Sequence, residues 1–177
     1  LEFRRVLFRS YPVQLRVYNI DRWGLAPVGG KLLRKEVDGI YHVAVAVHGH
    51  EYWFDHQVER LNLSDVFYVR GFSPVFMYDM GTTSIEPEET EAFCFGPLKE
   101  KYNIETYDCF YHNCHHFARD LCLQLTNKKI PQWLIDHGEQ GLSELSEENA
   151  KLVRMVSNEI APIMMVSWGR YSKRRFV

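Results

Sequence analysis

The chain contains the stretch Ile40-Tyr41-His42-Val43-Ala44-Val45-Ala46-Val47-His48, in which branched or aromatic side chains alternate with small ones and histidines. Successive side chains of a β-strand point to opposite faces, so Tyr41 and the three valines would share one face. His42, the two alanines and His48 would share the other. This period of two predicts a strand whose β-branched face is buried in the core. The small alanines would leave space for a helix to approach on the histidine face.

The segments around this strand predict more of a sheet. Gly49 can adopt turn dihedrals that other residues avoid, so the chain should turn there and return as a hairpin partner over 51–54. Residues 13–18 alternate apolar and polar side chains, which indicates another strand. Residues 75–80 can form a further strand that Gly81 would end. Between the strands expected at 51–54 and 75–80, residues 55–74 are expected to form a long connection with one short apolar segment at 66–69.

A helix is predicted directly after Asn113. Phe117, Leu121 and Leu125 recur every four residues, which is the spacing of one buried helical face. Asn113 is a good N-cap residue, so Cys114 falls in the first turn. Four other helices are expected: from Pro87 to about Phe95, where Gly96-Pro97 would break it, then Leu98–Tyr102, Gln132–Asp136, and a last one from Ser143 or Ser146 to about Ile160.

Composition narrows the class of protein. A chain of 177 residues that is 46% hydrophobic suits one compact catalytic domain, expected over 11–140 and followed by a C-terminal helix and basic tail over 141–177. Residues 1–10 read like translated adapter sequence and are expected to be non-native. Lys and Arg total 21 against 23 Asp and Glu, so we expect no nucleic-acid partner.

Cysteine usage and hydropathy indicate the compartment. No two of the four cysteines are spaced as C-x-x-C, which fits a reducing compartment. We therefore expect the protein in the cytoplasm, with the nucleus as an additional location. No window approaches eighteen consecutive apolar residues, so we expect no insertion into a membrane.

The placement of Cys114 suggests nucleophilic chemistry. A helix N-terminus presents unpaired N–H groups, which lower the pKa of a thiol from its usual value of about 8.5. The N–H of Cys114 itself could stabilise an oxyanion. A base is then needed, and His42, on a rigid strand, is the best candidate. His115 and His116 share the helix start with Cys114, where adjacent side chains diverge, and His112 precedes the cap.

Two other readings of these residues stay open at this point. A strand histidine such as His42 is, taken alone, more often a hydrogen-bonded core residue than a catalyst. Soft and imidazole ligands are also dense here, because Cys109, His112, Cys114, His115 and His116 fall in one short span. Structural zinc usually binds two separated ligand pairs, so we expect neither a metal nor a cofactor.

Four groups of residues resemble a known family. They are Tyr11-Pro12-Val13 with Val17-Tyr18, Gly39-Ile40-Tyr41-His42, Tyr107 followed by His112-Asn113-Cys114 with Phe117, and Leu125-Thr126 with Ile130-Pro131. In order and spacing they resemble the PPPDE domain, the permuted papain-like fold of the desumoylating isopeptidases. The resemblance extends from Tyr11 to about His137.

The resemblance implies an α/β (α+β) fold in which a small, mostly antiparallel sheet packs against helices. It also implies a thiol isopeptidase with His42 and Cys114 as a dyad, cleaving a ubiquitin-like modifier (SUMO or ubiquitin) from client proteins, and a homodimer. The same dyad would serve a protein S-acyl thioesterase acting in depalmitoylation. A non-catalytic module that binds modifier or client is the alternative from another class.

The chain departs from the family pattern in two places. His115-His116-Phe117-Ala118 stands where the family commonly has Asn and then a Phe-Ser pair, and 55–74 lacks the family's glycine-rich stretch. Substrate preference should therefore differ. We expect Asn113, His115, His116 and Trp53 to line the substrate groove.

Overall fold

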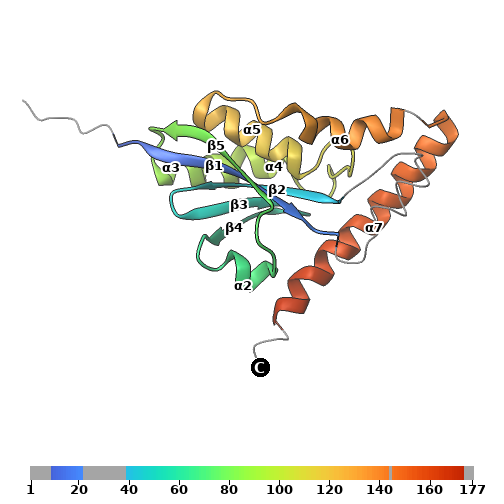
Figure 1. Cartoon of the computed structure of the whole chain (residues 1–177), viewed down its shortest axis with the longest axis horizontal. Coiled ribbons are helices and arrows are strands. Elements are labelled where there is room, and N and C mark those ends of the chain that lie inside the picture. The colour runs from blue at the N-terminus through green and yellow to red at the C-terminus, as the bar shows by residue number, and fades with distance from the viewer. Residues whose placement is uncertain (1–8, 22–38, 144, 174–177) are drawn as a thin grey trace, which may run out of the picture.

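The structure is a computed structural model that describes residues 9–21, 39–143 and 145–173. Five antiparallel strands form one sheet in the order β4-β3-β2-β1-β5 (Figure 1). They are β1 (Tyr11–Asn19), β2 (Tyr41–Val47), β3 (His50–Phe54), β4 (Val58–Asn62) and β5 (Phe76–Thr83). The predicted fold class, a small antiparallel sheet packed against helices, is confirmed.

The hairpin of β2 and β3 forms as the sequence predicts. His48 and Gly49 make its turn with positive φ angles of 53° and 73°, and Val47 pairs with His50. The ladder then runs only as far as the pair Val45 and Tyr52. Toward His42 the two strands are not paired, so the sheet is open between them at that end.

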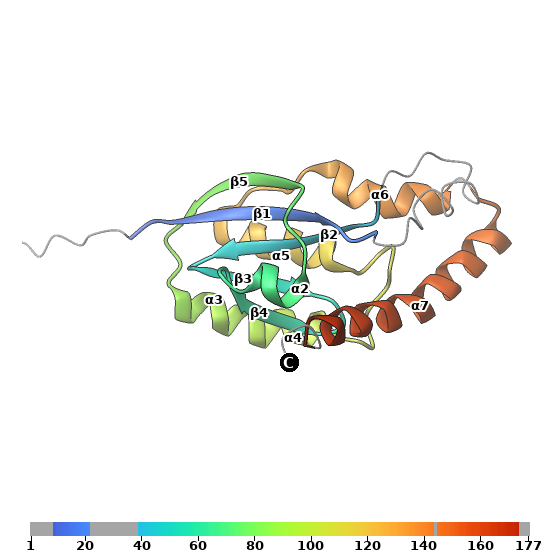
Figure 2. The same cartoon turned by 60° about the horizontal axis from the view of Figure 1, so that its bottom comes forward.

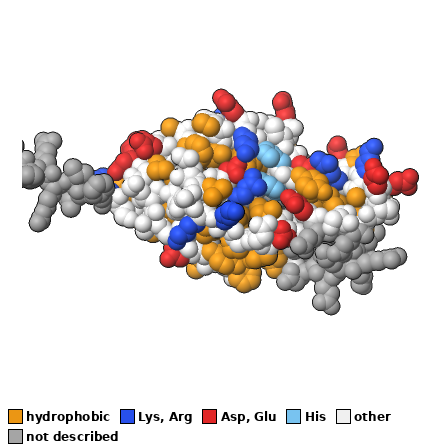
Figure 3. Space-filling view, turned by 90° about the horizontal axis from the view of Figure 1, so that it is seen from above, with side chains coloured by type: hydrophobic (Ala, Val, Ile, Leu, Met, Phe, Trp, Pro, Cys, Tyr) orange, Lys and Arg blue, Asp and Glu red, His pale blue; other side chains and the backbone are white. Residues whose placement is uncertain are grey.

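The valine face of the sheet carries the main core. Helix α5 (Cys114–Thr126) packs on it through Phe117, Ala118 and Leu121, which cluster with the buried valines of β1 and β2. Helix α3 (Pro87–Phe93), the π-helix η1 (Cys94–Leu98) and α4 (Lys99–Lys101) complete this layer beside β3 and β4. Figure 1 shows α5 and α6 (Gln132–Ser143) above β1 and β2, and Figure 2 shows α5 behind these two strands. Seen from above, basic side chains gather near the middle of this face, with histidine and hydrophobic side chains beside them (Figure 3).

The histidine face has a smaller core. Tyr18, Ala44 and Trp53 pack there against Val66 of the short helix α2 (Val66–Arg70). Helix α7 (Glu147–Lys173) runs alongside α2 (Figure 2). A helix does approach the alanines, as expected, but it is α2 and not the helix that carries Cys114.

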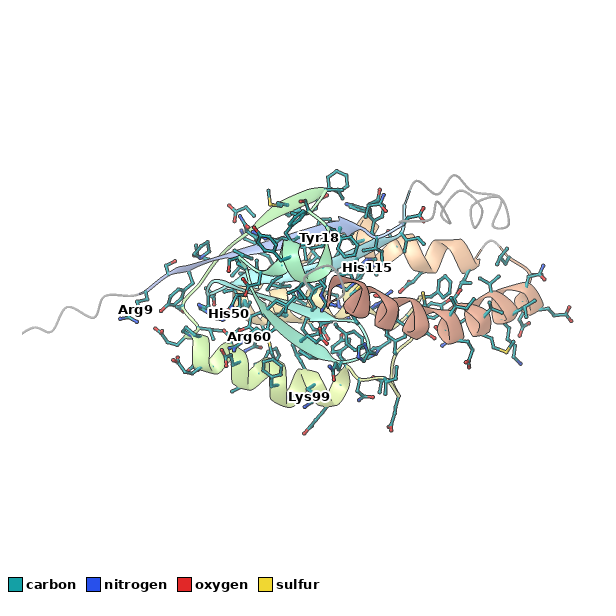
Figure 4. The ribbon with its side chains drawn as sticks, turned by 90° about the horizontal axis from the view of Figure 1, so that it is seen from below. Arg9, Tyr18, His50, Arg60, Lys99 and His115 are labelled. Atoms are coloured by element: carbon teal, nitrogen blue, oxygen red, sulfur yellow. The ribbon has the colours of Figure 1, made fainter. Side chains whose placement is uncertain are left out.

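Several element boundaries differ from the sequence prediction. Strand β4 was missed because it is a polar edge strand, with only Val58 buried; its Arg60 lies beside α3 and forms an ion pair with Glu91 (Figure 4). Strand β5 continues through Gly81, whose φ of 88° lies where the β1–β5 register shifts at a bulge. Pro97 does not break its helix, because the wider π turn accommodates the missing N–H.

The later helices are longer than expected. Helix α6 extends from Gln132 to Ser143, and α7 extends from Glu147 to Lys173 with Ser146 at its start. Within the described residues, no helix is both long enough and apolar enough to cross a membrane.

Candidate active site

The start of α5 is held by a dense set of hydrogen bonds around its N-cap, Asn113. The side-chain oxygen of Asn113 accepts from the N–H of His115 at 2.9 Å, and its amide donates to the carbonyl of Cys109 at 2.8 Å. His116 completes a capping box, because its Nδ1 lies 3.4 Å from the N–H of Asn113. These contacts fix Cys114 as the first residue of the helix, with 7% of its surface exposed.

The thiol of Cys114 is neutral in this arrangement. Burial raises its pKa to about 12, although the backbone N–H groups of Val43 and His115 favour the thiolate. The sequence predicted a lowered pKa from the helix N-terminus, and that prediction is wrong for the free protein. The helix end is present, but burial removes water from the thiolate. This destabilises the thiolate by more than the two N–H groups stabilise it.

His42 is also buried and neutral. Only 2% of its surface is exposed, and its ring stacks on Trp53 with 4.7 Å between centroids and 16° between planes. Burial, together with the nearby guanidinium of Arg70, lowers the pKa of His42 to about 3. A neutral imidazole has a free lone pair, which is the form that a general base requires.

The thiol and the imidazole approach the same point of β2 from different sides. Cys114 belongs to the core on the valine face and receives the N–H of Val43, whereas His42, one residue earlier, points to the α2 face. Among the described residues, no hydrogen bond joins the two side chains, and Nε2 of His42 has no hydrogen-bond partner. The register of β2 and β3 ends at Val45 and Tyr52, so the two strands are not paired beside His42.

The other histidines of this region make structural contacts. His115 Nε2 lies 3.1 Å from the carbonyl of Tyr41, and His116 Nε2 lies 3.7 Å from Glu139. His112 stacks on Tyr102 with centroids 4.4 Å apart. None of these contacts involves the thiol.

The residues expected in the substrate groove are buried in the same way. Asn113, His115, His116 and Trp53 all pack against internal partners, so their contact with substrate stays a prediction. The five candidate zinc ligands do not converge either. Within the described part of the chain, no group of three or more His, Cys, Asp or Glu side chains could hold a metal ion.

Sequence reasoning missed two charged residues at this site, Asp55 and Arg70. Asp55 follows β3 directly, and its Oδ1 lies 3.7 Å from Nε2 of His42. Arg70, from α2, donates to Oδ2 of Asp55 at 2.9 Å. The sequence did contain a signal for Asp55. A two-residue hairpin turn that pairs Val47 with His50 places residue 55 opposite residue 42 by simple counting.

The loop that precedes Cys114 is anchored to α7 through Asp108. Its Oδ1 accepts the N–H groups of Phe110 and Tyr111, and its Oδ2 accepts from Arg154 at 2.7 Å and Asn158 at 3.0 Å. Asn158 also accepts the N–H of Cys109 at 2.8 Å. Burial alone would raise the pKa of Asp108, but these hydrogen bonds outweigh it and the pKa is lowered.

Removing this anchor should loosen the loop. Asn158→Ala deletes both contacts of the amide and should lower the free energy of unfolding by about 1–3 kcal/mol, because Asp108 and Cys109 lose partners. Urea unfolding followed by tryptophan fluorescence measures this change. Asn149→Ala, an exposed asparagine of the same helix, is the matched control and should leave the midpoint unchanged. Equal effects of the two variants would contradict the anchoring role.

The neutral thiol predicts slow alkylation in the free protein. Near pH 7.5, Cys114 should react with iodoacetamide at least about 100-fold more slowly than an unhindered thiol, because its raised pKa leaves little thiolate. Its rate should still be rising above about pH 9. Site-resolved peptide mass spectrometry measures this rate, with the urea-unfolded chain as reference. A rate that already reaches its plateau near pH 6 would instead indicate a preformed thiolate–imidazolium pair.

Comparison with known proteins places these residues in a described domain. A family model for the PPPDE putative peptidase domain matches residues 11–152. A DeSI-like protein of Arabidopsis thaliana is 33% identical over 128 residues, a match that covers 70% of this chain and 53% of that protein. The chain therefore spans about half the length of that relative.

Two animal relatives are more distant in sequence but more similar in extent. Desumoylating isopeptidase 1 of Rattus norvegicus is 26% identical over 134 residues, and that of Homo sapiens is 26% identical over 133 residues. Each match covers 75% of this chain and 78% of the relative. The family match begins at β1 and ends in α7, so it includes both His42 and Cys114.

Proposed function

Because the chain belongs to the PPPDE putative peptidase family, we propose that it is a thiol isopeptidase that releases a ubiquitin-like modifier from lysine side chains of client proteins. Family membership supports the predicted class, a cysteine-type hydrolase. The names of the animal relatives support a SUMO-type modifier as the first substrate to test. The observation that carries the proposal is the position of Cys114, first in α5, against the Val43 N–H that follows His42.

The chemistry proceeds through a thioester. The neutral imidazole of His42 accepts the proton of the Cys114 thiol, and the sulfur attacks the carbonyl carbon of the isopeptide bond. The C–N bond breaks as His42 returns the proton to the lysine amine, which leaves. Water then attacks the thioester while His42 accepts its proton. The C–S bond breaks, His42 returns the proton to the sulfur, and the acid product leaves and ionises in water. The N–H of Cys114, at the helix start, donates to the oxyanion at each stage.

Substrate binding must change the free state for this reaction to proceed. Proton transfer from a thiol of pKa about 12 to an imidazole of pKa about 3 is strongly uphill while both are buried and apart. Entry of an extended modifier tail at the end where β2 and β3 are not paired brings the two groups together. Substrate entry therefore precedes activation of the thiol in this mechanism.

The decisive experiment compares three substrates with the purified full chain. They are a SUMO and a ubiquitin, each joined through its C-terminal glycine to the lysine of a fluorescent peptide, and a palmitoyl thioester peptide. We expect cleavage of at least one modifier conjugate, measured by fluorescence polarisation, and labelling of Cys114 by the matching modifier with a C-terminal electrophile. Cleavage of the palmitoyl thioester alone would overturn the proposal in favour of a thioesterase. Binding of a modifier without cleavage or labelling would overturn it in favour of a binding module.

The compartment and partners follow from this proposal. Modified client proteins of the cytoplasm or nucleus are the substrates, and the four cysteines, all free in the structure, are compatible with reducing conditions. A homodimer, as the family resemblance implies, is testable by sedimentation of the purified chain.

A further inference from the structure

A buried chain of charges leads from the surface to His42. Arg70 donates to Oε2 of Glu59 at 2.5 Å with one terminal nitrogen and to Oδ2 of Asp55 at 2.9 Å with the other. The second oxygen of Asp55, Oδ1, faces His42, and Asp55 is only 5% exposed. Buried charged groups are usually paired with a group of opposite charge or a hydrogen-bond partner. Arg70 is the partner of Oδ2 of Asp55, which leaves Oδ1 for His42.

The imidazole of His42 is held so that one nitrogen faces this carboxylate. Trp53 lies flat against the ring, and the guanidinium of Arg70 lies 4.9 Å from the centroid of Trp53. Nε2 of His42 is buried without a hydrogen-bond partner, and Oδ1 of Asp55 is 3.7 Å away. A small tilt of either side chain shortens this distance to that of a hydrogen bond. Without this bond to Asp55, the buried N–H of His42 would have no acceptor.

We propose that Asp55 is the positioning residue for His42. It accepts the Nε2–H of the neutral imidazole, and this fixes the tautomer in which Nδ1 carries the lone pair offered to the Cys114 thiol. The inference rests on the proposed function, because it assigns the orientation of that reaction's base. Asp55 itself contacts no reacting atom.

Arg70 compensates the negative charge of Asp55 beside His42. A lone carboxylate beside His42 would favour an imidazolium, which cannot accept a proton from the thiol. Arg70 balances the charge of Asp55, so the carboxylate orients the ring while His42 stays neutral. The ionisable groups that face His42 are Asp55 at the end of β3 and Arg70 of α2, with Glu59 of β4 behind Arg70. Tyr18 of β1 lies on the same face with its hydroxyl donating to Glu51, and Cys114 of α5 lies on the other face of β2.

The two charged residues should affect the pH dependence in opposite directions. In Arg70→Gln, the uncompensated Asp55 raises the pKa of His42, so the acid limb of kcat/KM moves to higher pH. In Asp55→Asn, loss of the negative charge moves that limb to lower pH. A residue that only supports the fold would lower activity at every pH without moving the limb in either direction.

Asp55→Asn should also change the tautomer of His42. The guanidinium of Arg70 has no acceptor, so it takes the amide oxygen of Asn, and the amide NH₂ then faces Nε2 of His42. Nε2 must accept, Nδ1 carries the proton, and the base is lost. We expect kcat to fall on the order of 100-fold or more, with KM little changed.

The test uses the full chain with ring ¹⁵N NMR of His42, assigned with His42→Gln, and pH profiles of conjugate cleavage. We expect the Nε2–H tautomer in the wild type, the Nδ1–H tautomer in Asp55→Asn, and opposite shifts of the acid limb in Asp55→Asn and Arg70→Gln. The matched control is Glu51→Gln, which alters another buried carboxylate on the same face of β3, bonded to Tyr18 and Arg16 instead of His42. It should leave the tautomer and the limb unchanged.

Two outcomes would overturn the positioning role: an Nδ1–H tautomer in the wild type, or a tautomer that Asp55→Asn and Glu51→Gln leave equally unchanged. The NMR result needs no substrate. If the tautomer switches as expected and no conjugate is cleaved, the positioning role stands and the proposed substrate class fails.

Discussion

Cys114→Ala is expected to remove all measurable isopeptide hydrolysis, a fall on the order of 10⁴-fold or more in kcat/KM. Without the sulfur no thioester can form at the start of α5. Cys94 and Cys122 lie inside helices in the buried main core, and Cys109 lies in the loop before the helix, so none of the three occupies this position. The substitution removes one buried atom and should leave the fold intact. Fluorescence polarisation of a modifier conjugate, with labelling by a modifier probe, measures the effect.

The matched control is Cys122→Ala, two turns further along the same helix and fully buried. It removes the same atom from the same helix and should retain hydrolysis. If Cys114→Ala kept its activity, or if labelling by the probe survived it, Cys114 could not be the nucleophile.

His42→Gln is expected to lower kcat by about 10²–10⁴-fold, the usual contribution of a general base. The effect should differ in kind from that of Cys114→Ala. The nucleophile remains, so a modifier probe should still label Cys114, slowly but to completion. A time course of quenched labelling reactions, in which the increase in protein mass is measured, distinguishes the two variants. Glutamine is close in size to histidine and should keep the contact with Trp53.

His48→Gln provides the comparison for His42→Gln. His48 follows the other end of β2, where it contacts Thr90 and Tyr11. Its replacement should leave kcat unchanged. A loss in both histidine variants alike would point to weakening of the sheet instead of loss of a base.

The alternation along β2 could be read from the sequence because each residue type there agrees with its burial. Val43, Val45 and Val47 do face the larger core, and the Asn113 cap does start the helix of Cys114. The hairpin followed from Gly49, and its register would also have placed Asp55 opposite His42. These features depend on local geometry, which short stretches of sequence encode.

The features that the sequence did not reveal depend on tertiary surroundings. β4 is polar because it is an edge strand, so its pattern resembles a loop until Arg60 is seen beside α3. Pro97 predicts a break unless the π turn is known. Most importantly, the pKa of Cys114 depends on how much water the rest of the chain excludes, and no local motif records that quantity.

The anchor between Asp108 and α7 has a consequence for where the folding unit ends. The family match stops at residue 152, yet both side chains that hold Asp108, Arg154 and Asn158, come after that point. A fragment trimmed to the shared region would keep His42 and Cys114 while leaving the Asp108 loop untethered. The region shared with the family is therefore shorter than the region that these hydrogen bonds hold together. A shortened version for crystallisation or engineering should include Arg154 and Asn158.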